Sequence, residues 1–126
     1  MERYDAEVSP VAKEWLALDP DERTLLVERY HRDARIELPK QARPFHALIH
    51  TVVENQLALE DQIVVRETLS RLTSAGLTRH EAIHAIGSVL IGYFNKLVRD
   101  KESPPEGHAP YYAALRELDA KKWREG

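Results

Sequence analysis

Apolar residues recur at three- and four-residue intervals through most of this 126-residue chain. Such spacing gathers them on one face of an α-helix, whereas a half-buried β-strand needs alternation at every second residue. The stripe in residues 44–58 consists of Phe45, Leu48, Ile49, Val52, Val53 and Leu57. The stripe in residues 78–99 consists of Ile83, Ile86, Val89, Leu90, Tyr93, Phe94 and Leu97. The periodicity therefore predicts an all-α protein.

Residues that begin and end helices divide the chain into five to six segments. Asp19-Pro20 joins an N-cap residue to a proline at the first helical position, and Glu22 would complete a capping box. Gly76 suits the left-handed conformation in which many helices end. The expected helices cover residues 10–18, 20–35, 44–58, 61–75, 78–99 and 109–123, and residues 36–43 form a connector.

Length and composition indicate one compact helical bundle, a single domain over residues 1–126. The net charge of −3 provides no strong field for nucleic acid. No apolar run approaches the roughly 20 residues of a membrane span, and the charged N-terminus lacks the apolar region of a signal peptide. We therefore expect a cytoplasmic protein with neither nucleic acid nor membrane as partner. The sequence permits a homo-oligomer without arguing for one.

Four of the six histidines form two pairs with four-residue spacing, His46 with His50 and His80 with His84. Residues four apart lie on one face of a helix, so the two imidazoles of a pair can ligate one transition metal. Glu54 extends the line of His46 and His50 by one further turn, as a ligand or as a partner of a ligand. The metal-site core is expected within residues 44–99, with these five side chains as its ligands.

The residue types also indicate the metal. The chain has no cysteine, which excludes a thiolate site. Imidazole with carboxylate suits a divalent transition metal, with zinc expected first and iron, nickel or copper also compatible.

Glu81 lies inside His80-Glu81-Ala82-Ile83-His84, an HExxH motif. In this motif two histidines hold Zn²⁺ and the glutamate activates a metal-bound water, which makes Glu81 a candidate catalytic base. Thr78 and Glu81 also match a capping box, in which the glutamate would instead bond to the start of its own helix. Both interpretations stay open at this point.

The two remaining histidines, His31 and His108, lie in a Tyr-His-Arg stretch and in a loop, and we expect both to be exposed. Glu54 has an alternative as a solvated residue or as the partner of Arg66 or Arg79.

Residues 43–56 (RPFHALIHTVVENQ) and 78–90 (TRHEAIHAIGSVL) resemble a group of small bacterial helical proteins, the domain-of-unknown-function 1841 family. The resemblance covers about residues 38–97 and departs from the family at residues 40–45, where the approach to the first histidine helix is longer. No reaction is established for this family, so the resemblance implies none. It implies joint action of His46, His50, Glu54, His80, Glu81 and His84.

Three functions are compatible with these residues. The favoured one is a small helical protein that binds a divalent metal through the two histidine pairs. The second is a metal-dependent hydrolase with an open coordination position and Glu81 or Glu54 as base. The third is a metal-free helical module for protein interaction, in which the histidines are pH-sensitive contacts. The sequence favours metal over no metal and does not separate the first two.

Overall fold

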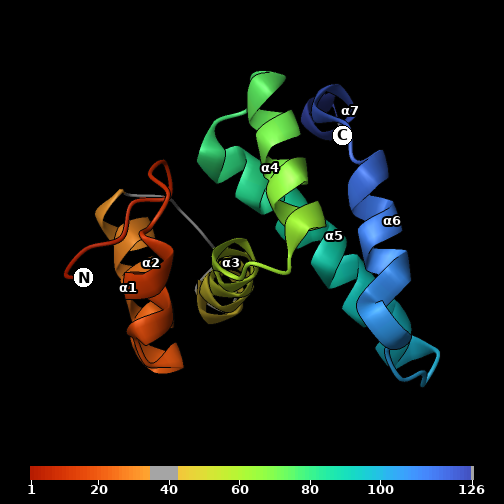
Figure 1. Cartoon of the computed structure of the whole chain (residues 1–126), viewed down its shortest axis with the longest axis horizontal. Helices are drawn as coiled ribbons and strands as arrows, with labels where there is room; N and C mark the ends of the chain where they lie inside the picture. Colours follow the sequence, from red (N-terminus) through yellow and green to blue (C-terminus); the bar gives the residue numbers. More distant parts are fainter. Residues whose placement is uncertain (35–42, 126) are drawn as a thin grey trace. The chain divides into compact units, whose positions relative to one another are not determined.

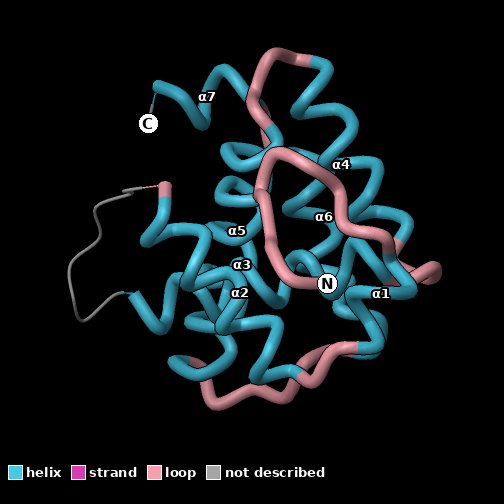
Figure 2. Tube along the Cα trace, turned by 90° about the vertical axis from the view of Figure 1, so that its left-hand side faces the viewer, coloured by secondary structure: helices cyan, strands magenta, loops and turns pink. Residues whose placement is uncertain are grey.

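The computed structural model describes residues 1–34 and 43–125, and all regular secondary structure in these two ranges is helical (Figure 2). This confirms the all-α prediction, with seven α-helices there in place of the five to six expected. The predicted connector at residues 36–43 falls outside the described residues except for Arg43, and so does the side chain of Phe45. No helix of the described ranges has both the length and the apolar character needed to pass through a bilayer.

The chain divides into two compact units, Met1–Asp61 and Gln62–Gly126. A single domain over residues 1–126 stays a prediction.

The first unit consists of α1 (Ala12–Ala17), α2 (Pro20–Asp33) and α3 (Arg43–Ala58), and α3 contacts both of the others (Figure 1). Its core contains Tyr4, Ala6, Trp15, Leu26, Val27 and Ala47. The buried indole of Trp15 donates through Nε1 to Oδ1 of Asn55 at 2.9 Å, and Arg23 donates to the same oxygen at 3.1 Å. Asn55 on α3 thereby holds α1 and α2 through one side chain.

The helix starts of this unit differ in part from the prediction. Proline occupies the first position of α2 as expected, but the side chain of Asp19 makes no capping bond, so the predicted capping box with Glu22 is wrong. The first helix was expected from residue 10 but begins at Ala12, with Val11 as its N-cap. Arg23 instead secures the link between the two helices, because its guanidinium donates to the carbonyls of Leu16 at 2.9 Å and Leu18 at 2.8 Å.

The second unit consists of α4 (Ile63–Ser74), α5 (Arg79–Arg99), a 3₁₀ turn (Glu106–His108), α6 (Ala109–Glu117) and α7 (Ala120–Glu125). The helices α4, α5 and α6 contact one another in pairs. Their largest fully buried side chains are Val65, Leu72, Ile83, Ile86 and Leu115.

The turn between α4 and α5 fixes where α5 begins. Gly76 has a φ of +104°, the left-handed conformation predicted for it. Its N–H donates to the Thr73 carbonyl at 3.0 Å, and the Leu77 N–H donates to the Leu72 carbonyl at 3.2 Å, which is the bonding of a Schellman motif. Thr78 follows at once as the N-cap of α5.

The last predicted helix, over residues 109–123, is divided into α6 and α7, and that expectation is therefore corrected. Leu118 is extended, and the Asp119 carboxylate accepts the N–H of Lys122 at 3.0 Å, which begins a new helix. This hydrogen bond lowers the pKa of Asp119. Arg71 of α4 donates to the carbonyls of Leu115 and Leu118 and so satisfies the end of α6.

Candidate metal centre

The inward face of α3 mixes polar and apolar side chains, although the sequence pattern predicted an apolar one. Val53 is buried as predicted and Ala47 is buried too, but so are His50, Thr51 and Glu54, whereas Leu48, predicted to face the core, is 49% exposed. Ionisable side chains are seldom buried without compensation, because removing a charge from water costs free energy. A buried histidine and glutamate one turn apart therefore mark this face as a candidate functional site.

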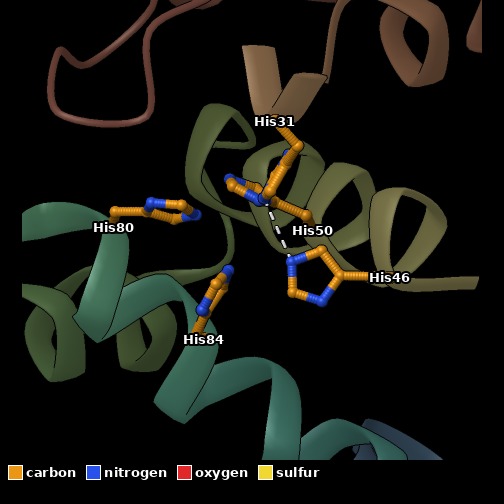
Figure 3. A group of neighbouring side chains, drawn as sticks. All are labelled: His31, His46, His50, His80 and His84. Carbon is orange, nitrogen blue, oxygen red and sulfur yellow. Dashed lines mark hydrogen bonds between the residues drawn. The ribbon is translucent and has the colours of Figure 1, made fainter. Parts of the chain in front are cut away.

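Three histidines of the first unit converge on this face. His31 comes from α2, and His46 and His50 come from α3 (Figure 3). The ring centroid of His31 lies 4.7 Å from that of His46 and 5.0 Å from that of His50. Each histidine offers a ligand atom within 4.8 Å of those of the other two, and the Nε2 atoms of His31 and His46 are 3.0 Å apart. This group could hold a metal ion.

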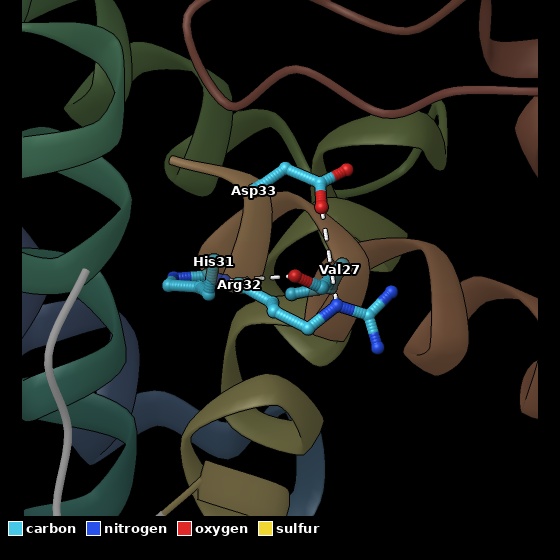
Figure 4. Close-up of polar contacts among 4 residues, drawn as sticks. All are labelled: Val27, His31, Arg32 and Asp33. Atoms are coloured by element: carbon cyan, nitrogen blue, oxygen red, sulfur yellow. Dashed lines mark hydrogen bonds and ion pairs between the residues drawn. The ribbon is translucent and has the colours of Figure 1, made fainter. Parts of the chain in front are cut away.

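His31 was predicted to be exposed, and that prediction is wrong, because its side chain is only 5% exposed. Its Nδ1 lies 2.8 Å from the carbonyl oxygen of Val27 (Figure 4). A carbonyl can only accept, so Nδ1 carries the proton and the lone pair is on Nε2, the atom that faces His46. One sequence signal could have predicted the burial of His31: it lies four residues after the apolar Val27, on the same helix face. The next two residues, Arg32 and Asp33, are exposed and pair with each other.

Burial favours the neutral form of these imidazoles. Desolvation lowers the pKa of His31, although its bond to the Val27 carbonyl acts in the opposite direction. Desolvation also lowers the pKa of His46, with a further lowering from the neighbouring His31. Neutral imidazole is the form that ligates a metal, so burial prepares both rings for coordination.

Glu54 and Tyr4 extend the site behind His50. Glu54 is 1% exposed, which excludes the solvated alternative considered for it. The hydroxyl of Tyr4 donates to the Glu54 carboxylate and lies 2.7 Å from Nε2 of His50. Sequence reasoning did not find Tyr4, because it precedes the first helix and belongs to no periodic pattern.

The second unit carries the other histidine pair. His80 and His84 occupy the first two turns of α5, and both are half-buried. Their ring centroids are 4.1 Å apart, and each offers a ligand atom within 4.8 Å of the other's (Figure 3). The predicted arrangement of the pair on one helix face is confirmed.

Glu81 takes part in a capping box at the start of α5. Its backbone N–H donates to Oγ1 of Thr78 at 3.1 Å, and its Oε1 accepts the Thr78 N–H at 3.0 Å. The bond that the Thr78 N–H donates to the Glu81 carboxylate is the main reason that the pKa of Glu81 is lowered. The capping interpretation is therefore confirmed, and a catalytic role for Glu81 stays a prediction.

His108, the sixth histidine, is exposed as predicted. Its Nδ1 lies 3.0 Å from the hydroxyl of Tyr93, and it takes no part in either histidine group.

Comparison with protein-family models, with curated proteins and with solved structures found no match to this chain. The resemblance to the domain-of-unknown-function 1841 family therefore stays a prediction, and the chemistry of the site has to be argued from its own residues.

Proposed function

We propose that this protein binds one divalent transition-metal ion through histidine imidazoles, with Zn²⁺ as the metal expected first. The convergence of His31, His46 and His50 carries the proposal. In a tetrahedral zinc site with Zn–N bonds of about 2.0–2.1 Å, two ligand nitrogens lie about 3.3 Å apart. The Nε2 atoms of His31 and His46 are 3.0 Å apart, so a small movement of the two rings would admit an ion between them.

Three imidazoles leave the coordination of zinc incomplete, because a closed site needs four protein ligands. The sequence predicts the His80–His84 pair as further ligands, and we propose that one imidazole of this pair supplies the fourth ligand. Their four-residue spacing and the proximity of their rings support this assignment, since such a pair can approach one ion from one helix face.

A metal-free explanation of the same geometry also exists and has to be tested. With the lone pair of His31 on Nε2, the Nε2–H of His46 can donate to it, and the two rings then satisfy each other without an ion. The imidazoles are neutral both in the metal-bound arrangement and in the metal-free one, so their charge does not distinguish the two. Metal content distinguishes them directly.

No reaction is assigned to the site. Hydrolysis would need a carboxylate free to activate a water, and the two candidates are engaged elsewhere. The Glu81 carboxylate bonds to the Thr78 amide, and the Glu54 carboxylate bonds to the Tyr4 hydroxyl. Binding is therefore proposed in preference to catalysis.

The first experiment measures metal content by plasma mass spectrometry on untagged protein from cells supplied with zinc, iron, nickel and copper. We expect about one ion per chain in the wild type. The variants His31→Ala/His46→Ala and His80→Ala/His84→Ala should both lose it, because each removes at least one of the four proposed ligands.

Two results would change the proposal. Full metal content in the His80→Ala/His84→Ala variant would remove α5 from the coordination and leave the ion to the first unit. A metal-free wild type whose melting temperature is the same with and without chelator would overturn metal binding and leave a helical interaction module.

A further inference from the structure

Tyr4 connects the segment before α1 to two side chains of α3. It is 4% exposed, and its hydroxyl contacts both His50 and Glu54, which are one helical turn apart. Its ring also packs at 5.5 Å from Trp15 and 5.6 Å from Tyr30, measured between centroids. The position of the hydroxyl is therefore held by the aromatic core of the first unit as well as by its own hydrogen bonds.

The direction of these hydrogen bonds determines the tautomer of His50. A phenol has one proton, and Tyr4 donates it to the Glu54 carboxylate, which can only accept. The phenol oxygen must then accept from Nε2 of His50 across the 2.7 Å between them. In the neutral ring the proton is thus on Nε2 and the lone pair on Nδ1.

We infer that Tyr4 and Glu54 are positioning residues for the metal: they hold His50 in the tautomer that presents Nδ1 as its ligand atom. This inference rests on the proposed metal binding. It assigns His50 the opposite nitrogen from His31, whose Nδ1–H donates to the Val27 carbonyl and leaves Nε2 as the ligand atom.

The carboxylate gives this chain of bonds a second effect. A hydrogen-bonded carboxylate makes a ligating imidazole more basic, and here the phenol of Tyr4 transmits that effect from Glu54 to His50. The buried negative charge is also favoured by a nearby dication. Loss of such an outer partner typically weakens metal affinity by about 10- to 100-fold.

Tyr4→Phe tests the inference, because it keeps the packed ring and removes only the hydroxyl. In the metal-free wild type, ¹⁵N chemical shifts of the imidazole should show His50 protonated at Nε2. In the variant the shifts should move toward a mixture of tautomers, and the affinity for Zn²⁺ should fall by about 10- to 100-fold.

Tyr112→Phe is the matched control. Tyr112 is a half-buried tyrosine of the second unit whose hydroxyl donates to Oε1 of Gln62 at 2.5 Å. It also loses a bond from phenol to side-chain oxygen, but neither Tyr112 nor Gln62 belongs to the histidine group, so the variant should leave the tautomer and the affinity unchanged. Glu54→Gln is a second variant that keeps an acceptor for the phenol and removes the charge, so it should retain the tautomer and weaken Zn²⁺ binding.

The tautomer measurement separates this inference from the proposed function. A metal-free wild type with His50 protonated at Nδ1 would overturn the role of Tyr4, whatever the metal content. Unchanged Zn²⁺ affinity in both Tyr4→Phe and Glu54→Gln would overturn it as well. Failure of the wild type to bind any metal, with the tautomer as expected, would instead reject the proposed function and with it the positioning of a metal ligand.

Discussion

Single hydrogen bonds indicate which nitrogen His31 and His50 of the first unit can offer. His31 is oriented by a backbone carbonyl one turn away on its own helix. His50 is oriented by Tyr4, which is 46 residues away in the sequence. The bond between His31 and Val27 is local and forms whenever α2 is helical. The bond between His50 and Tyr4 forms only when the N-terminal segment is packed against α3.

His31 gives a prediction at the residue scale. His31→Ala should weaken Zn²⁺ binding by more than the roughly 10- to 100-fold expected for an outer partner of a ligand, because it removes a ligand itself. Competition with a chromophoric chelator measures the affinity.

His108→Ala is the control for this prediction, since it removes an exposed imidazole that belongs to neither histidine group. Equal affinity in the two variants would remove His31 from the coordination.

The helix α5 shows how a local signal positions a functional side chain. The turn at Gly76 and the capping box at Thr78 determine the residue at which the helix begins. His80 and His84 follow within the first two turns, so their direction depends on that start. The glutamate of the HExxH motif caps the start of the helix and so supports the two histidines of the motif, one on either side of it.

Thr78 gives a prediction at the element scale. Thr78→Ala should lower the free energy of unfolding by about 1 kcal/mol, because the N–H of Glu81 loses its acceptor. Hydrogen exchange should also be faster in the first turn of α5. Urea denaturation measures the first effect and amide exchange the second.

Thr73→Ala is the comparison for Thr78→Ala. The hydroxyl of Thr73 donates only to carbonyls of its own helix, at 3.0 Å to Leu69 and 3.1 Å to Ser70. Alanine has the higher helix propensity, so this variant should be neutral or slightly more stable. A loss as large as that of Thr78→Ala would show that the cap is not the cause.

At the scale of the whole molecule, the candidate ligands are divided between two units that each have buried apolar residues of their own. Metal binding would contribute to the stability of the unit that holds the ion, since an ion that binds only the folded state stabilises it by mass action.

Removal of the metal gives the corresponding prediction. With free Zn²⁺ at 1,000 times its dissociation constant, binding adds about 4 kcal/mol, so a chelator should lower the melting temperature by on the order of 10 °C. Calorimetry measures the shift, and hydrogen exchange shows where protection is lost. Loss of protection in α3 is expected, and additional loss in α5 tests the sequence prediction that His80 or His84 ligates the ion. Loss confined to α3 would contradict ligation by either of these two residues.

The sequence by itself determined the helices and most of their limits. The apolar periodicity, Gly76 and the capping box at Thr78 act through residues at most a few positions apart, so they can be read without a fold. The same holds for the histidine pairs His46–His50 and His80–His84, because four-residue spacing places both members on one helix face.

Only the tertiary structure decided what lies around those pairs. The burial of His31, the burial of polar residues on α3 and the contact of Tyr4 with His50 and Glu54 each depend on packing between segments far apart in the chain. Apolar periodicity identifies the face of a helix that is apolar, but the face that is buried is decided by what packs against it. In α3 the two coincide at Val53 but not at Leu48, which is exposed, and the buried polar residues His50 and Glu54 belong to the candidate metal centre.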